Sequence, residues 1–167
     1  MTLVESVRPA VDGDLAAIGE IYDHYVRISH ATFDTEPVGA EQRREWLAEH
    51  AGGRHRIVVA VGAGRVIGFA RSGRYRPRPA YDTTVETSVY VDPWFVGRGV
   101  GDALYRTLFD ALKGEDVHRA LAGIALPNDA SVALHERFGF RRVAHFSDQG
   151  RKFGRFWDVD WYERPIA

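Results

Sequence analysis

The sequence contains no cysteine, which excludes disulfide bridges, thiolate nucleophiles and cysteine-based zinc sites. Its seven histidines show no zinc-ligand spacing, so we expect no metal site. No apolar run approaches the roughly 20 residues that span a bilayer. The formal net charge of −1 predicts no general attraction to nucleic acid or to an anionic membrane. Residues 1–5 lack the basic and apolar regions of a signal peptide, so a cytoplasmic protein is the simplest expectation.

What remains is the composition of an ordinary globular protein. The chain has 167 residues, of which 45% are hydrophobic and 27% charged. This length suits one well-buried domain and is short for two, and no linker or internal repeat divides it. We therefore expect a single domain over residues 1–167.

Hydrophobic periodicity predicts alternating strands and helices with hairpins among them. The expected strands are 6–10, 56–61, 66–70, 84–91, 119–124, 142–148 and 156–161. The expected helices cover residues from about 14 to 25, 41–50, 100–112 and 131–137, and residues 73–82 are expected to form a loop. This order predicts an α/β protein with a mixed sheet flanked by helices.

Three glycines at alternate positions join the apolar strand 84–91 to the helix at 100–112. Gly97, Gly99 and Gly101 can adopt positive φ angles and leave no side chain between backbone N–H groups and a ligand. The first N–H groups of the following helix lack internal acceptors, and the helix dipole adds partial positive charge there. This turn predicts an anion site that suits a pyrophosphate. It matches neither a Rossmann fingerprint nor a Walker loop.

The same turn resembles the acetyl-CoA motif of the GNAT superfamily of N-acetyltransferases. That motif has Gln or Arg, two residues, Gly, one residue, then Gly or Ala, and residues 96–101 match it except that Val96 replaces the first polar residue. Four further segments are similar to phosphinothricin and methionine sulfoximine N-acetyltransferases, so the likeness covers almost the whole chain. The similar segments are 33–37, 80–91, 126–140 and 154–159. The resemblance implies a GNAT fold whose central sheet is mixed, mostly antiparallel and split in a V.

For catalysis, the resemblance singles out Glu86 as the general base, acting directly or through a water. A carboxylate within a β-branched strand is costly unless it is paired or functional, and partial burial would raise its pKa; a structural ion pair with an arginine is the alternative. His135 is a candidate second proton-transfer or site-ordering group, although a helix histidine is more often structural. Tyr90 is a candidate proton donor to the leaving thiolate, with a buried core tyrosine as the equal alternative.

The resemblance also implies which residues bind acetyl-CoA. Backbone groups of the strand would meet the pantetheine, a backbone N–H near Val89 would bind the oxyanion, and Arg98 would be the only nearby cation. Asn128 would bond the pantetheine or the thioester region, or it is an ordinary turn and N-cap residue. The expected acetyl-CoA ligands are Val89, Tyr90, Val91, Gly97, Arg98, Gly99, Val100, Gly101, Asp102 and Asn128.

A small amino-acid analogue is the acceptor that the resemblance implies, with its carboxylate or phosphinate held by arginine. Arg74, Arg76 and Arg78 crowd one loop, where a solvated charged surface is the plain alternative. The expected substrate contacts are Phe33, Arg76, Pro77, Arg78, Tyr81, Glu86, Thr87 and Ser88, and Lys152, Phe153 and Arg155 are weaker candidates.

The sequence thus predicts direct acetyl transfer from acetyl-CoA to an α-amine in a ternary complex. The acceptor would be of the phosphinothricin, methionine sulfoximine or methionine sulfone type, which implies resistance to such compounds. A homodimer is expected, and the aromatic-rich segment 156–162 agrees with it. Two alternatives stay open: an enzyme for another amine such as a peptide N-terminus, and a non-catalytic acyl-CoA-binding module.

Overall fold

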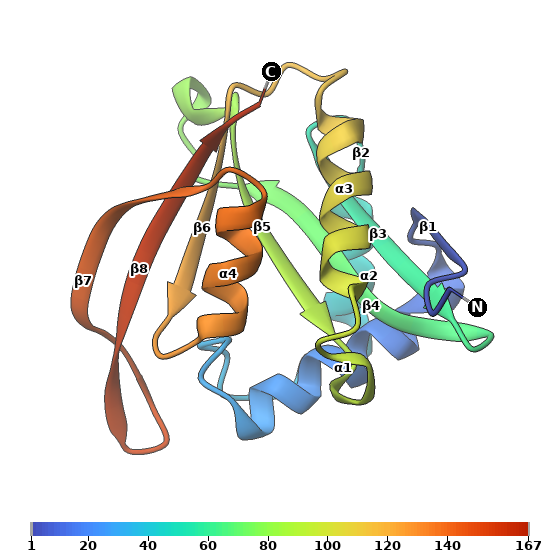
Figure 1. Cartoon of the computed structure of the whole chain (residues 1–167), viewed down its shortest axis with the longest axis horizontal. Coiled ribbons are helices and arrows are strands. Elements are labelled where there is room, and N and C mark those ends of the chain that lie inside the picture. Colours follow the sequence, from blue (N-terminus) through green and yellow to red (C-terminus); the bar gives the residue numbers. More distant parts are fainter. Residues whose placement is uncertain (1, 167) are drawn as a thin grey trace.

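One twisted sheet organises the chain, which a computed structural model describes over residues 2–166 (Figure 1). Its strands are ordered β1-β3-β4-β5-β6-β8-β7, and the short β2 pairs with β3. The strands are β1 (Ser6–Pro9), β2 (Ala51–Gly52), β3 (His55–Gly62), β4 (Arg65–Arg74), β5 (Thr84–Val91), β6 (Arg119–Ala125), β7 (Arg141–Lys152) and β8 (Arg155–Pro165). The helices are α1 (Leu15–Ile28), α2 (Ala40–Glu49), α3 (Val100–Leu112) and α4 (Asp129–Arg137), with short 3₁₀ turns at Asp12–Asp14, Pro79–Tyr81 and Pro93–Phe95.

The centre of the sheet is split. β5 and β6 form the one parallel pair among the described strands, and they pair only from Thr84 with Arg119 to Glu86 with Leu121. Beyond Glu86 the two strands diverge, as Figure 1 shows, while β5 stays paired with β4 and β6 with β8. Backbone groups of residues 87–91 and 122–125 therefore face a gap in which a ligand can form hydrogen bonds.

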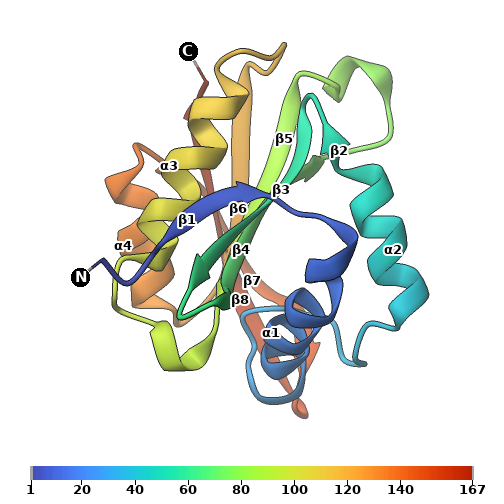
Figure 2. The same cartoon turned by 90° about the vertical axis from the view of Figure 1, so that its right-hand side faces the viewer.

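Helices cover the two faces of the sheet separately: α3 and α4 lie on one face, and α1 and α2 on the other (Figure 2). The amphipathic α3 buries Leu104, Leu108 and Leu112 completely in the first core. In the second core, α1 buries Ile18 and Tyr22 against β3 and β4. The first core therefore spans both halves of the split sheet, with Val85 of β5 and Ala120 of β6 among its buried residues, whereas the buried strand residues of the second core belong to β3 and β4.

The closing hairpin is longer than the sequence predicts. The expected strands 142–148 and 156–161 extend to Arg141–Lys152 and Arg155–Pro165. β7 is an edge strand with mostly exposed residues, and its register shifts between Phe146 and Gly150, so it lacks the regular alternation that would reveal a strand. Similarly, β4 continues through Gly73 and Arg74 into the expected loop, because both residues pair with β5.

The fold class is confirmed, since the sheet is mixed, mostly antiparallel and split between β5 and β6. The predicted element order agrees with the structure except for the short β2, which the sequence does not predict. The single domain over residues 1–167 stays a prediction. None of the helices described is long and apolar enough to cross a membrane.

Candidate active site

Two pockets meet at the split from opposite faces of the sheet. One has a volume of about 540 Å³ and is lined by residues of α3, α4 and the glycine turn. The other has a volume of about 620 Å³ and is lined by residues of α1, α2, β4 and the closing hairpin. We call them the donor pocket and the acceptor pocket. They share the lining residues Ala31, Thr87, Ser88, Tyr90, Gly123 and Ala125, so the split connects the two faces.

The glycine turn forms one end of the donor pocket. Gly97 and Gly99 have φ angles of 75° and 81°, a conformation that side chains disfavour, although a Cβ at either residue would meet no atom within 4 Å. A Cβ at Gly101 would lie 3.1 Å from Cδ2 of Leu134 on α4. The first bond of α3 runs from the Ala103 N–H to the Gly99 carbonyl at 3.1 Å, so the earlier amides point out of the helix without a partner in its ladder. The turn is therefore an open cradle of N–H groups at a helix N-terminus.

The entry to this turn is held by Asp92, a buried residue. Its carboxylate accepts the Trp94 N–H at 2.9 Å and pairs with Arg65 at 2.8 Å. Tyr25 donates its hydroxyl to the Val91 carbonyl at 2.5 Å, and its burial raises the pKa of this phenol to about 12. These bonds fix where the strand ends and the cradle begins.

Arg137 is a cation that lines the donor pocket, while the contact of Arg98 with acetyl-CoA stays a prediction. Arg98 is exposed and lies outside the lining, whereas Arg137 of α4 lines it and holds Asp102 through two bonds of 3.1 and 2.9 Å. Asn128 also lines the pocket, and its side-chain oxygen caps α4 by accepting the Ser131 N–H at 3.2 Å. Sequence reasoning missed Arg137 because its approach to Asp102 depends on how α4 packs beside α3.

His135 lies on the donor side of the sheet and both of its ring nitrogens are engaged. Nδ1 donates to the Ser131 carbonyl at 2.7 Å, which leaves Nε2 to accept the Tyr105 hydroxyl at 2.9 Å. Burial lowers the pKa of His135, so the ring is neutral. This arrangement favours the site-ordering role over proton transfer, and Glu86 projects from the opposite face of the sheet.

Glu86 faces the acceptor pocket at the point where the strands separate. It shares one face of the sheet with Ser88 and Tyr90, because alternate strand residues point the same way. Within residues 2–166 its carboxylate has no ion pair within 4 Å. Burial raises the pKa of Glu86, and the charge of Arg71 partly offsets this. A partly buried carboxylate at a pocket wall suits a general base.

Arg71 is a residue of this pocket that sequence reasoning missed. It lies opposite Ser88 in the β4–β5 register, and its Nε donates to the Ser88 hydroxyl at 3.0 Å. Its guanidinium carbon lies 4.6 Å from the centre of the Trp46 ring, so the cation rests on an aromatic face. The sequence feature that could have revealed Arg71 is its place within the run 66–72, which is otherwise buried. A charged side chain in a buried strand needs a partner or a ligand.

Tyr90 lies among aromatic rings on the same face. Its ring centre is 5.1 Å from that of Tyr22, 5.6 Å from that of Tyr25 and 5.5 Å from that of Phe69. Burial raises the pKa of Tyr90, which keeps the phenol protonated. Because the residue lines both pockets, it meets the positional requirement for a proton donor at the split.

The predicted substrate residues divide into two groups. Phe33, Thr87 and Ser88 line the acceptor pocket together with Glu86. The residues that line neither pocket are Arg76, Pro77, Arg78 and Tyr81, and all four are exposed. The Arg76 guanidinium instead lies over Tyr75 and Tyr81. A role for that loop in substrate binding stays a prediction, and Arg74 is the arginine of the predicted cluster that reaches the pocket.

The loop after α1 covers the split and is fastened to the β7–β8 hairpin. The buried Lys152 ammonium donates to the carbonyls of Tyr25, Ser29 and Thr32 at 3.4, 2.6 and 2.8 Å, and burial lowers its pKa. The Phe33 ring occupies the place where a side chain at Gly150 would be. Lys152 therefore positions the pocket wall by holding the loop rather than by facing the pocket.

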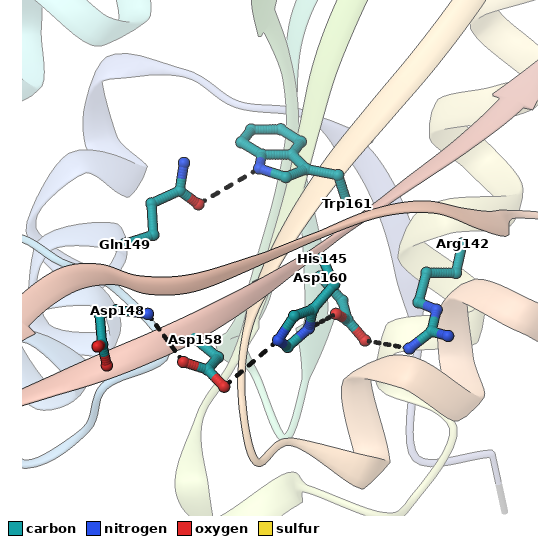
Figure 3. A network of polar contacts seen from close by, with 7 residues as sticks. All are labelled: Arg142, His145, Asp148, Gln149, Asp158, Asp160 and Trp161. Carbon is teal, nitrogen blue, oxygen red and sulfur yellow. Dashed lines mark hydrogen bonds and ion pairs between the residues drawn. The ribbon is translucent and has the colours of Figure 1, made fainter.

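A polar network supports the irregular part of β7 beside the acceptor pocket (Figure 3). His145 lies between two carboxylates of β8, 2.6 Å from Asp160 and 3.4 Å from Asp158. Asp158 also accepts the backbone N–H of Asp148 at 2.9 Å. The next residue, Gln149, lines the acceptor pocket, so the network fixes the bulge that carries it.

Comparisons with known proteins agree with this arrangement. The family model described as "Acetyltransferase (GNAT) family" matches residues 18–140. Phosphinothricin N-acetyltransferase of Streptomyces coelicolor is 55% identical over 163 residues, covering 96% of this chain and 95% of the relative. L-methionine sulfoximine/L-methionine sulfone acetyltransferase of Pseudomonas paraeruginosa is 35% identical, covering 95% and 92%.

A solved structure shows the same fold. The GNAT superfamily phosphinothricin acetyltransferase of Sinorhizobium meliloti, in complex with acetyl-CoA, superposes with a TM-score of 0.93 at 32% identity and covers 100% of this chain and 90% of that one. Within residues 2–166 no cluster of three or more potential metal ligands occurs. With its split sheet, glycine cradle and matching family model, the chain belongs to the GNAT family of acetyl-CoA-dependent N-acetyltransferases.

Proposed function

We propose that this enzyme acetylates the α-amine of a small amino-acid analogue of the phosphinothricin, methionine sulfoximine or methionine sulfone type. The observation that carries the proposal is the joint presence of Glu86 and Arg71 in the acceptor pocket. One is a carboxylate suited to accept a proton from an ammonium group, and the other is a cation suited to bind an anionic group. A substrate with both groups on one small framework fits this pair, and the names of the relatives describe such substrates.

Acetyl-CoA fits the donor pocket by the chemistry of its lining. The positive φ angles of Gly97 and Gly99 keep backbone N–H groups open toward a pyrophosphate, and Arg137 adds a cation at the same end. Backbone groups of residues 89–91 in the split can pair with the pantetheine amides as an added strand would. When bound, acetyl-CoA supplies the acetyl group as a thioester.

Substrate orientation falls to Arg71 and the aromatic walls of the acceptor pocket. The Ser88 hydroxyl and the Trp46 ring hold the guanidinium, so its terminal nitrogens are available for two parallel bonds to a carboxylate or phosphinate. Phe33 lines the same pocket and contributes an apolar wall for the acceptor side chain. This assigns to Arg71 the anion contact that the sequence predicts for Arg76.

Proton removal is the role proposed for Glu86. An amine attacks only when neutral, and a carboxylate whose pKa is raised by burial is a stronger base than an ordinary one. Tyr90, whose phenol stays protonated and lines both pockets, can donate a proton to the leaving sulfur. A backbone N–H at Val89, next to the split, is the proposed oxyanion donor. Because the sequence contains no cysteine, direct attack in a ternary complex is the proposed course.

We further propose that the enzyme works as a homodimer. Four large apolar side chains of the edge hairpin are exposed: Val143, Phe146, Phe153 and Phe156. A second copy covering them would remove this apolar surface from water. Light scattering after size exclusion tests this, with a dimer mass expected. A cytoplasmic location, where acetyl-CoA is available, and resistance to the acetylated compounds belong to the same proposal.

The test of the proposed activity is a thiol-release assay with acetyl-CoA against a panel of amines. The panel contains phosphinothricin, methionine sulfoximine, methionine sulfone, methionine, an alanyl tripeptide and a polyamine. We expect N-acetylated products, identified by mass, from the first three. Glu86→Gln should lose turnover while it still binds acetyl-CoA. In a non-catalytic binding module the same substitution would have no turnover to remove. Acetylation of the tripeptide or polyamine alone would contradict the proposal, and Arg71 in the pocket argues against such acceptors.

A further inference from the structure

A histidine that the proposed chemistry leaves unused, His50, lines the acceptor pocket beside Glu86. It lies at the C-terminal end of α2 and is half-buried. A role for this ring rests on the proposed function, because it concerns the fate of the proton that the amine loses. Its hydrogen bond, its position in the sheet register and the charges around it define what the ring can do.

The protonation of the two ring nitrogens follows from one hydrogen bond. Nδ1 of His50 lies 2.6 Å from the Trp46 carbonyl oxygen, and a carbonyl can only accept. Nδ1 therefore carries the hydrogen, and in the neutral ring Nε2 presents a lone pair. The ring is held in the tautomer in which its other nitrogen accepts a proton.

The register of the sheet places Nε2 over Gly73, the residue that pairs with Glu86. A Cβ built on Gly73 would lie 3.2 Å from Nε2 of His50. Gly73 is the direct partner of Glu86 in the β4–β5 ladder, so the side chains of the two positions share one face with Cβ atoms about 5 Å apart. Nε2 thus occupies the space above Gly73, on the face of the sheet that carries the Glu86 side chain, and both residues line the acceptor pocket.

Burial is the main reason why the His50 ring is neutral. Burial lowers the pKa of His50, and the backbone bond to Trp46 opposes this only in part. The charges that act on the ring come from Glu49 of α2, His55 of β3 and Arg71 of β4. The other charged side chains that line the same pocket are Arg74 and Glu86. A neutral ring is the form that can accept a proton.

We propose that His50 is a second proton acceptor, which takes the proton that Glu86 removes from the substrate ammonium and passes it toward solvent. The ammonium loses two protons as the N–C bond forms and the C–S bond breaks. One proton reaches the departing sulfur and the other leaves the protein. His55, whose ring centre is 6.4 Å from that of His50 and which is partly exposed, lies on the outward side of this route.

The proposal is tested with His50→Asn, because the asparagine amide can still donate to the Trp46 carbonyl while Nε2 is lost. His118→Asn, at an exposed histidine that lines neither pocket, is the matched control. At pH 7 we expect kcat to fall at least about tenfold with little change in the KM of the amine, and free imidazole to restore part of it. The kcat of the variant should continue to increase to a higher pH than the kcat of the wild-type enzyme. Loss of activity without imidazole rescue, or an unchanged pH profile, would overturn the proposal.

A second measurement uses the wild-type enzyme and needs no substrate. With ¹⁵N-labelled histidine, NMR should show His50 at pH 7 as the neutral tautomer protonated at Nδ1. A charged ring or the opposite tautomer would overturn the inference even if the variant cannot be folded. If no amine in the panel is acetylated, the proposed function fails instead. If the panel is acetylated and His50→Asn behaves as the wild type, only the role of His50 fails.

Discussion

Replacement of Arg71 should separate substrate binding from chemistry more clearly than any other change. Arg71→Gln keeps a polar side chain that can reach the Ser88 hydroxyl, but it removes the charge and the paired donors. Hydrogen bonds to charged groups contribute about 1.5–3 kcal/mol each, and two such bonds to one anion share the guanidinium. We therefore expect a loss of about 2–4 kcal/mol in transition-state binding. That corresponds to a roughly 30- to 1000-fold fall in kcat/KM, carried mainly by KM.

The same substitution has an independent effect on Glu86. Arg71 lowers the pKa of this carboxyl against the effect of burial, so its removal should raise the pKa further. The acid limb of the kcat/KM profile should then move to higher pH. Arg71→Lys retains the charge without the planar fork, and it should show the binding loss with little movement of this limb.

The assay is thiol release at saturating acetyl-CoA with the acceptor varied, from pH 5.5 to 9. Arg76→Gln is the matched control, because Arg76 is an exposed arginine outside both pockets. If Arg76→Gln raised the KM of the acceptor more than Arg71→Gln did, the assignment of the anion contact to Arg71 would be refuted and the sequence-based prediction would stand. Acetyl-CoA binding should be unchanged in both variants.

Three further predictions concern the carboxylate, the cradle and the fastening of the loop. Glu86→Gln should raise Tm above pH 7 but not near pH 4. Burial raises the pKa of Glu86, so the stability of the protonated form is fully present below the ordinary carboxyl pKa of about 4.3 and is lost as the pH rises through the raised pKa. An equal difference in Tm at both pH values would contradict this. Gly99→Val places a β-branched residue at a φ of 81°, which costs about 1–2 kcal/mol of backbone strain. Calorimetry should detect no acetyl-CoA binding to this variant. The control, Val96→Ala, should bind acetyl-CoA as the wild type does. Lys152→Met leaves three carbonyls without their donor and should lower the free energy of unfolding by about 2 kcal/mol in urea, while the exposed Lys113→Met should lower it by less than about 0.5 kcal/mol.

The sequence reveals those parts of the site that depend on local signals. The cradle was predictable because positive φ angles select glycine and because a helix begins directly after Gly99. Glu86 was predictable because a carboxylate within a β-branched strand contrasts with its neighbours. The fold class followed from the alternation of strand and helix patterns, and the family resemblance supplied the split.

Other parts of the site depend on contacts between residues far apart in the chain. Arg71 meets Ser88 through the β4–β5 register, and Lys152 reaches Tyr25 across 127 positions of sequence. His50 reaches the pocket because Gly73 has no side chain, a fact that only the folded backbone shows. The arginine-rich loop after β4 is a different case: its clustered charge predicts a binding site, and Arg76 lies over neighbouring tyrosine rings outside both pockets, so its role in substrate binding stays a prediction.

The short contact between β5 and β6 has a mechanical consequence. Three residue pairs join the two halves of the sheet near Glu86, so a small rotation there would change the width of the gap farther along the strands. The contacts of Lys152 with the end of α1 and the following loop join the same two halves at a distance from this hinge. The hinge, this distant tie and the first core, which packs against strands of both halves, all act on the spacing between the two substrates. Mutations in the hairpin should therefore change the reaction rate even though they touch no reacting atom.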